Sequence, residues 1–398
     1  YAAGAKLAQD FAACGAVHVG GAAVWNVAKD KTVSYLLDGG SRKIQGRSLV
    51  LASGAMERPF PVPGWTLPGV MGAGAAQILY KSSGAVPTEP VVLAGCGPLL
   101  FLLAQQYLDA GVKIKALIHT TGTGDYLRAA SHVLGALCGW KDLSKGSRML
   151  KKIRSHGVQT FAGASAFAIE GAEKAEAITF THDGQRKRVQ ASLVLLHQGV
   201  VPNTQLSWSL RAEHRWDEQQ LCWIPVTDAC GQIEETGIYI AGDSRGIVGA
   251  KASASQGRLA GLAIAHQLQA ISPEKFKAHE PAILEEIRAH TQIRPFLDTL
   301  YRPQDAHRIP ADDEVTVCRC EEVKAGQIKK YVEVGCLGPN QTKAFGRCGM
   351  GPCQGRLCGL TVTEIIASER KVSPQEVGYY RIRPPIKPIT LGELASFE

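Results

Sequence analysis

Cysteines gather near the C-terminus at a spacing that limits how this part of the chain can fold. Cys318 and Cys320 form a Cys-x-Cys pair, and Cys348, Cys353 and Cys358 follow in a glycine-rich stretch. Thiolates at such spacings are typical ligands of metal ions and of iron–sulfur clusters. The glycines between them allow tight turns in which backbone N–H groups can point at sulfur. Any fold of this segment therefore has to bring several sulfur atoms to one centre.

Structural zinc is the main alternative to an iron–sulfur cluster here. Zinc sites usually pair cysteines that lie two or more residues apart, and a Cys-x-Cys pair is less usual there. An iron–sulfur cluster is typically held by four thiolates, so five candidates compete for four places. We expect Cys348 beside the cluster and Cys336 as a small buried apolar residue. The expected ligands are Cys318, Cys320, Cys353 and Cys358.

Size and composition favour two or three compact units. The chain has 398 residues, 45% of them hydrophobic, and a net charge of +8. The basic residues are scattered, without a Lys/Arg-rich run that interleaves aromatic residues, so no nucleic-acid partner is expected. No apolar run reaches membrane-spanning length, so no transmembrane segment is expected. The other cysteines lie singly, which suits a reducing compartment. We expect a cytoplasmic location, with peripheral association with the inner membrane as the alternative.

A strand–glycine turn–helix unit predicts a Rossmann-like domain. The apolar strand Pro90–Ala94 is followed by the turn Gly95-Cys96-Gly97-Pro98 and by a helix over Leu99–Ala110. Glycines at such a turn let the backbone approach a pyrophosphate at a helix N-terminus. However, Leu100 stands at the third glycine position, and His119 stands where an acidic residue would bind a ribose hydroxyl. An altered dinucleotide domain is therefore favoured over a working NAD or NADP site.

Three further motifs indicate contact with a flavin. Two buried strands end in small residues, one at Ala52-Ser53-Gly54 and one at Gly199. A third strand delivers Gly242 and Asp243 to the loop before a helix over Gly249–Leu268, where the carboxylate could accept hydrogen bonds from ribityl hydroxyls. The N-terminal dipole of that helix could stabilise negative charge on the reduced ring. The alternative is that Asp243 only caps the helix.

Other elements follow from hydrophobic periodicity. Helices are predicted over Tyr1–Cys14, Asp125–His156 and Pro273–Pro303, and strands over Thr32–Leu37, Val112–Ile118 and Leu193–Gln198. Val158–Val194 is predicted as a strand meander with a hairpin turn at His182-Asp183-Gly184.

Taken together, these motifs resemble those of known protein families. Ala52–Pro59, Gly95–Pro98, Gly199–Asn203 and Ala241–Asp243 resemble the flavoprotein superfamily with two dinucleotide-binding domains. Cys318–Val323 and Arg347–Cys358 resemble the bacterioferritin-associated-ferredoxin-like [2Fe–2S] domain. Their combination resembles the alpha (A) subunit of bacterial flavin-dependent amino-acid dehydrogenases, a group that includes opine oxidases, proline and hydroxyproline dehydrogenases and hydrogen cyanide synthase.

The resemblance implies an α/β fold with two Rossmann-like domains of the pyridine-nucleotide-disulfide-reductase type and a small α-rich [2Fe–2S] domain. The implied division is a truncated FAD-type domain over 1–80 and 199–270, an NAD-like domain over 88–198, a helical connector over 271–310 and the cluster domain with its extended tail over 311–398. The implied cofactor-binding residues are Ala52, Ser53, Gly54, Gly95, Gly97, Pro98, Gly199, Gly242 and Asp243.

The resemblance also implies a function. A beta subunit similar to D-amino-acid oxidases would oxidise the substrate on its own FAD. This chain would relay electrons through an FMN at the subunit boundary to the [2Fe–2S] cluster and an external electron acceptor. No catalytic acid–base pair can be assigned to the chain itself.

One departure from the family concerns the start of the chain. The family opens with a strand, a Gly-x-Gly-x-x-Gly turn and a helix that cradle the phosphates of FAD or another adenine nucleotide, and nothing before Tyr1 supplies them. We therefore expect a fragment with only the flavin-side contacts. Two alternative functions are a self-sufficient NAD(P)H-dependent flavin oxidoreductase and an iron-handling docking module.

Overall fold

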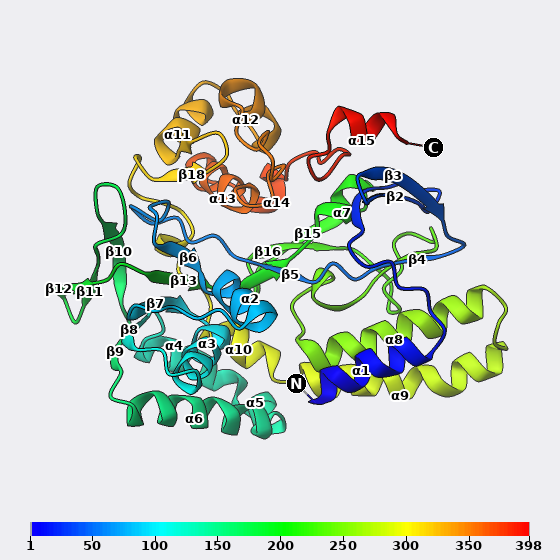
Figure 1. The fold of residues 1–398 in the computed structure, drawn as a ribbon, viewed down its shortest axis with the longest axis horizontal. Helices are drawn as coiled ribbons and strands as arrows, with labels where there is room; N and C mark the ends of the chain where they lie inside the picture. Colours follow the sequence, from blue (N-terminus) through cyan, green and yellow to red (C-terminus); the bar gives the residue numbers. More distant parts are fainter. Residues whose placement is uncertain (1, 398) are drawn as a thin grey trace.

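A parallel sheet of five strands organises the middle of the chain (Figure 1). The computed structural model describes residues 2–397. The strand order is β6 (Val70–Gly72), β13 (Val194–Gln198), β7 (Val91–Cys96), β8 (Ile114–His119) and β9 (Gln159–Ala162). All neighbouring strands run parallel. Parallel strands are covered on both faces, which explains why β7 is buried at every position.

Helices cover one face of this sheet, and an antiparallel sheet packs on the other. Side chains alternate along a strand, so Val91 and Leu93 face the helices while Val92 and Ala94 face the antiparallel sheet. The helices are α2 (Ala73–Ser83), α3 (Pro98–Asp109) and α6 (Trp140–Ser155). The antiparallel strands are β10 (Ser165–Glu170), β11 (Ala177–His182) and β12 (Gln185–Gln190). Two short helices, α4 (Thr123–Ala129) and α5 (Val133–Cys138), connect β8 to α6.

A second region is formed by segments that precede the strands of this sheet in the sequence together with segments that follow them. β4 (Leu49–Leu51) pairs in parallel with β17 (Ile238–Ile240), and β5 (Ala55–Glu57) pairs with β14 (Val200–Pro202). A sheet of β1 (Ala23–Val27), β2 (Thr32–Leu37) and β3 (Gly40–Gln45) belongs to this region, as do α7 (Gln205–Ser209), β15 (His214–Asp217) and β16 (Cys222–Pro225). Helices α8 (Ala250–Gln267) and α9 (Pro273–Thr291) pack on each other at one end of the molecule (Figure 1), and the chain begins with the exposed helix α1 (Ala2–Ala13).

The cysteine-rich segment forms a small helical unit at the opposite side of the molecule (Figure 1). It follows α10 (Arg294–Leu300) and contains the ribbon of β18 (Thr316–Cys318) and β19 (Val323–Lys324). Its helices are α11 (Ala325–Glu333), α12 (Pro339–Gly346), α13 (Gly359–Arg370) and α14 (Pro374–Val377). An extended tail then leads to α15 (Leu391–Ala395), which packs near β3. The unit has its own hydrophobic core, to which Cys318, Cys348 and Cys358 belong.

The predicted fold class is confirmed, because the chain has Rossmann-type α/β organisation and a helical C-terminal region. The predicted strand Thr32–Leu37 coincides with β2, and the predicted helix Gly249–Leu268 with α8. Tyr1, where a helix was expected to begin, lies outside the described residues. The division into domains stays a prediction, although β6, which falls within 1–80, pairs with β13 in the five-stranded sheet. No helix among the described residues is long and apolar enough to cross a membrane.

Replacing Gly95 by alanine should destabilise the chain strongly. Gly95 has φ +136°, and a Cβ there would overlap the carbonyl oxygen of His197 on the neighbouring strand. We expect Gly95→Ala to lower the free energy of unfolding by about 3 kcal/mol or more. Gly157→Ala is the matched control, because Gly157 has φ +68° with open space around it, and it should cost only about 1 kcal/mol. Urea denaturation of both variants gives the comparison, and equal losses would contradict the steric explanation.

Candidate metal centre and cofactor sites

Three buried cysteines form the inner part of the candidate metal centre. The sulfur atoms of Cys318, Cys348 and Cys358 all lie within 4.8 Å of one another. Cys318 ends β18, Cys348 follows α12, and Cys358 is the N-cap of α13. Each has at most 1% of its surface exposed. Three elements far apart in the sequence thus converge on one sulfur-lined centre.

Hydrogen bonds favour negative charge on Cys318. The thiols of Cys348 and Cys358 hydrogen-bond to its sulfur and, together with the backbone N–H groups of Gly349 and Glu321, hold the pKa of Cys318 well below its usual range. The same interactions raise the pKa of Cys358. Metal ions bind deprotonated cysteine, so hydrogen-bond donors aimed at a buried sulfur suit a cation or a cluster. The expected backbone N–H groups aimed at sulfur are present.

Cys320 and Cys353 form an outer pair. Cys320 is exposed and Cys353 is partly exposed. Partial burial raises the pKa of Cys320, while a hydrogen bond from the backbone N–H of Cys353 lowers it. The five cysteines are thus arranged as a buried group and an adjoining pair that faces solvent. Cys336 lies apart, is buried, and donates its S–H to the carbonyl oxygen of Gly338 at 3.3 Å.

The structure brings the four predicted ligands together as two pairs. Cys318 and Cys358 are in contact, and Cys320 and Cys353 lie next to each other. Cys348, which was expected beside the cluster, lies within 4.8 Å of both buried members, and the Tyr380 hydroxyl donates to its sulfur at 3.4 Å. The set of four therefore stays a prediction, with Cys348 as its direct competitor.

Glycines make the close approach of this hairpin possible. A Cβ on Gly351 would overlap Cβ of Cys320, and a Cβ on Gly349 or Gly355 would lie within 2.6 Å of the Tyr380 ring. Four or more sulfur donors, buried on one side and cradled by glycines that no side chain can replace, fit an iron–sulfur cluster of the kind held by thiolates. The residues present therefore agree with the group that the sequence resemblance implies.

Polar contacts attach the cysteine unit to the rest of the chain. The Gln205 amide on α7 donates to the carbonyl oxygen of Gln354, between Cys353 and Cys358, at 2.8 Å. Arg308 pairs with Glu364 on α13, and both side chains are almost fully buried. A buried ion pair of this kind costs much stability if one partner is removed, because the other charge is then left unpaired. The centre is therefore held against a fixed support.

The predicted flavin motifs converge at the end of the five-stranded sheet. The Ser53 hydroxyl donates to the carbonyl oxygen of Asn203 at 2.9 Å, and the Asn203 N–H donates to the carbonyl oxygen of Gly54 at 2.9 Å. A Cβ on Gly97 would lie 3.9 Å from Cα of Gly199. Four motifs separated in the sequence thus share one neighbourhood, since the N–H of Ala241, next to Gly242, donates to Leu51, next to Ala52.

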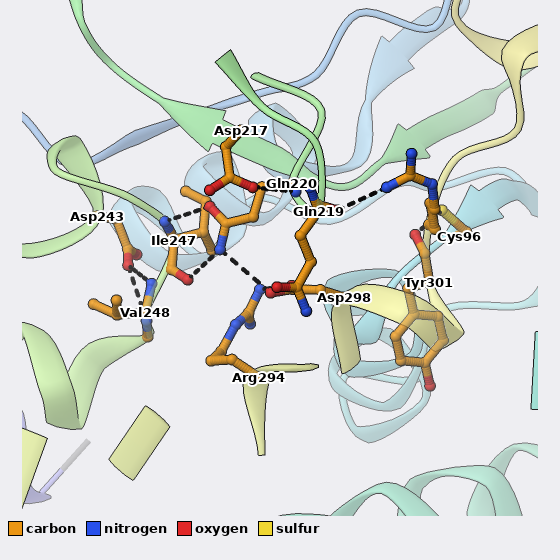
Figure 2. Close-up of polar contacts among 12 residues, drawn as sticks. Cys96, Asp217, Gln219, Gln220, Asp243, Ile247, Val248, Arg294, Asp298 and Tyr301 are labelled. Carbon is orange, nitrogen blue, oxygen red and sulfur yellow. Dashed lines mark hydrogen bonds and ion pairs between the residues drawn. The ribbon is translucent and has the colours of Figure 1, made fainter. Parts of the chain in front are cut away.

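Asp243 organises the loop in front of α8. Its Oδ1 accepts hydrogen bonds from the N–H groups of Val248 and Gly249, both at 2.9 Å (Figure 2). These contacts hold the loop that precedes the helix, but they do not cap it, because the N-cap residue of α8 is Gly249 and no side chain bonds to the N–H groups of its first turn. No hydrogen bond to Oδ2 is found among residues 2–397. The loop positions the N-terminus of an 18-residue helix, and flavin contact by Asp243 stays a prediction.

Gln220 links that loop to the connector. Its amide nitrogen donates to the carbonyl oxygen of Ile247 at 2.8 Å and to Asp298 on α10 at 3.3 Å, and its amide oxygen accepts from the N–H of Ile247 (Figure 2). Burial raises the pKa of Asp298, while its ion pair with Arg294 acts in the opposite direction. The candidate flavin loop and the connector therefore form one hydrogen-bonded network.

The connector also packs on the glycine turn. The thiol of Cys96 points at the backbone carbonyl of Tyr301 at 3.5 Å (Figure 2), and the Tyr301 ring packs against Phe101 on α3. His119, at the end of β8, is buried against Phe101, and burial lowers its pKa. A neutral imidazole at this position offers no carboxylate to a ribose. The altered character of this turn stays a prediction.

Sequence reasoning missed a pair formed by a partly exposed carboxylate and a buried imidazole. Glu57 Oε1 lies 2.6 Å from Nδ1 of His197 and accepts the N–H of Gly74 at the start of α2 at 3.0 Å. The His197 ring lies beneath the glycine turn, 3.5 Å from where a Cβ on Gly97 would stand. The only sequence signal was Glu57 within the Ala52–Pro59 motif and a histidine inside an otherwise apolar strand.

Comparison with known proteins places this geometry in a family. A family model described as pyridine nucleotide-disulphide oxidoreductase matches residues 16–267, and one described as sarcosine oxidase A3 domain matches residues 316–397. The A subunit of opine oxidase from Rhizobium meliloti is 44% identical over 404 residues, which cover 100% of this chain and 76% of that protein. The chain belongs to the family of opine oxidase A subunits. The family resemblance read from the motifs is thereby confirmed.

Two further relatives support membership in this family. The HcnB subunit of hydrogen cyanide synthase from Pseudomonas aeruginosa is 31% identical over 398 residues, which cover 96% of this chain and 84% of that protein. The solved structure of L-proline dehydrogenase from P. horikoshii superposes with a TM-score of 0.68 at 17% identity, covering 94% of this chain and 64% of that one. The latter likeness supports the fold alone.

Replacing His214 should make the chain less sensitive to acid. The His214 ring stacks on Trp208 at 3.7 Å, and Trp208 stacks on Tyr379 beside the cysteine turn. Burial lowers the pKa of His214 to about 4, from 6.5. As pH falls from 6.5 toward 4, the unfolded chain binds this proton while the folded chain does not, so stability is lost in that window. The loss amounts to up to about 3 kcal/mol for this one group.

Melting temperatures at about pH 7.5 and about pH 5, on either side of the ordinary histidine pKa, test this effect. On going from the higher to the lower pH, the melting temperature of wild type should fall more than that of His214→Phe. The phenylalanine ring can still stack on Trp208 but cannot bind the proton. His132→Phe, at an exposed histidine, should behave like wild type. Equal acid sensitivity of wild type and His214→Phe would contradict the assignment.

Single cysteine replacements decide the ligand set. Cys353→Ser should lose the cluster, because a ligand is removed, while Cys348→Ser should retain it. Iron content and the visible spectrum after anaerobic purification give the readout. Cys336→Ser is the control, since Cys336 lies outside the sulfur group. Loss in Cys348→Ser with retention in Cys353→Ser would assign the fourth place to Cys348.

Proposed function

We propose that the chain is the electron-transfer subunit of a heteromeric flavin and iron–sulfur dehydrogenase that acts on an amino acid or opine. The observation that carries this proposal is the group of five cysteines, three of them buried and in contact, in a chain of the opine oxidase family. A subunit that only bound substrate would have no need of such a centre. The electrons would come from a partner subunit and leave to an external acceptor.

Cys318, Cys320, Cys353 and Cys358 would hold a [2Fe–2S] cluster. When bound, the cluster supplies storage for a single electron. The chain's own residues perform the surrounding tasks. The N–H groups of Gly349 and Glu321 stabilise negative charge on sulfur, the helical core excludes water from the inner side, and exposed Cys320 leaves the outer side accessible.

The converging strand ends would hold the flavin-side groups. Ala52–Gly54, Gly199 and Gly242–Asp243 meet at one end of the sheet, and the helix α8 directs its N-terminus at the same place. A helix N-terminus stabilises nearby negative charge, as develops on a reduced flavin or on a phosphate. We place FMN at the boundary with the partner, and FAD or another adenine nucleotide at the chain's own dinucleotide fold.

Substrate oxidation belongs to the partner in this proposal. Several relatives are named as individual subunits, among them those of opine oxidase and of hydrogen cyanide synthase, which supports a multi-subunit enzyme. The partner would be a beta subunit similar to D-amino-acid oxidases, with its own FAD. A cytoplasmic location fits the many free cysteines, because thiols stay reduced in that compartment.

Anaerobic purification of the full chain tests the proposal. We expect about two iron and two sulfide ions per chain and the visible absorbance of a [2Fe–2S] cluster. Addition of NADH should leave the spectrum unchanged, because His119 and the packed connector disfavour nucleotide binding at the glycine turn. A chain without iron would contradict the proposal, and rapid bleaching by NADH would favour a self-sufficient reductase instead.

A further inference from the structure

A tryptophan from the loop before the five-stranded sheet contacts the Cys-x-Cys segment. Trp65 lies in the loop between β5 and β6 and is only 8% exposed. Its Nε1–H donates to the carbonyl oxygen of Thr316 at 2.7 Å. The guanidinium of Arg319 stacks over its ring, 5.2 Å from the ring centroid. The two contacts fall on either side of Cys318, two residues before it and one residue after it.

The loop that carries Trp65 is itself fixed. The N–H of Trp65 donates to the carbonyl oxygen of Val62 at 3.1 Å, and the carbonyl oxygen of Pro63 accepts from the N–H of Ile169 on β10 at 2.8 Å. Gly64 packs so closely on Ile169 that a Cβ would overlap its carbonyl oxygen. Trp65 therefore cannot shift without disturbing the packing of β10, and the Cys-x-Cys segment is held against a rigid surface.

Arg319 is an uncompensated cation between two candidate ligands. It stands between Cys318 and Cys320, and no ion pair to Arg319 is found in the described part of the chain. Arg347, next to Cys348, pairs with Glu321 at 2.9 Å, whereas Arg356, between Cys353 and Cys358, has no ion pair among the described residues. Arg319 thus contributes a net positive charge beside the sulfur group, while the charge of Arg347 is balanced. The aromatic ring of Trp65 holds that charge in place, because a cation is attracted to the face of an indole.

We infer that Trp65 is a positioning residue that holds Arg319 beside the cysteine site and thereby raises the reduction potential of the centre. This rests on the proposed function. Reduction adds an electron to the centre, so a fixed cation nearby stabilises the reduced form more than the oxidised form. The same contact joins the loop between β5 and β6 to the Cys-x-Cys segment.

The midpoint potential of the centre in the full chain tests this inference, with EPR spectra of the reduced form as a second readout. Arg319→Gln should lower the ratio of reduced to oxidised centre at a given potential about tenfold, which corresponds to about 59 mV for one electron. Arg319→Lys should restore most of the wild-type value, because the charge is kept. Arg288→Gln, at an exposed arginine on α9 away from the cysteine unit, is the control and should leave the potential unchanged.

A double-mutant cycle separates positioning by Trp65 from a direct effect. Trp65→Leu should lower the potential in the same direction as Arg319→Gln, and the double variant should show little further shift, because Trp65 acts through Arg319. Trp65→Phe, which keeps an aromatic face, should shift the potential less than Trp65→Leu and serves if the leucine variant does not fold.

The outcomes distinguish the two proposals. A wild-type chain without a reducible iron centre overturns the proposed function and this inference together. A wild-type chain with a normal centre whose potential does not respond to Arg319→Gln overturns the inference alone. Additive shifts in the double variant would show that Trp65 does not act through Arg319, which also overturns the inference.

Discussion

Bringing five cysteine sulfurs together is the constraint on which the C-terminal part of this structure depends. Buried thiolates repel one another, so their proximity requires shared protons, hydrogen-bond donors or a cation. The hydrogen bonds that converge on Cys318 meet this need on the inner side. The glycines of the hairpin, the Tyr380 hydroxyl and the buried Arg308–Glu364 pair are all arranged around it. The unit thus has the features of a support for a sulfur-bound centre.

The part of the fold set by local pattern could be predicted from sequence. Continuous apolar runs ending in glycine identified β7 and β13, and the Ala-rich stretch identified α8, because periodicity and turn residues act over a few positions. The cysteine spacing likewise indicated a sulfur-lined centre. The motifs as a set identified the family, which is now established by a relative 44% identical over the whole chain.

Features set by contacts between distant segments could not be predicted. Cys348 joins Cys318 and Cys358 in one sulfur group because α12 and α13 pack together, which spacing alone does not reveal. Glu57 contacts His197 only because β5 lies near the end of β13 in the fold. Likewise, β6 joins the central sheet by pairing with β13, which lies more than a hundred residues further along the chain. Asp243 has the sequence setting of a flavin ligand, and its contacts in the structure hold the loop before α8 without capping that helix.

The central claim is that electrons from a partner's substrate reach the cysteine centre of this chain. The most direct measurement is EPR spectroscopy of the complex with its beta subunit, frozen after anaerobic addition of the amino acid or opine. The account predicts the signal of a reduced [2Fe–2S] cluster, and its absence when this chain is mixed with substrate alone. Reduction of the flavins in the complex without any cluster signal would contradict the account.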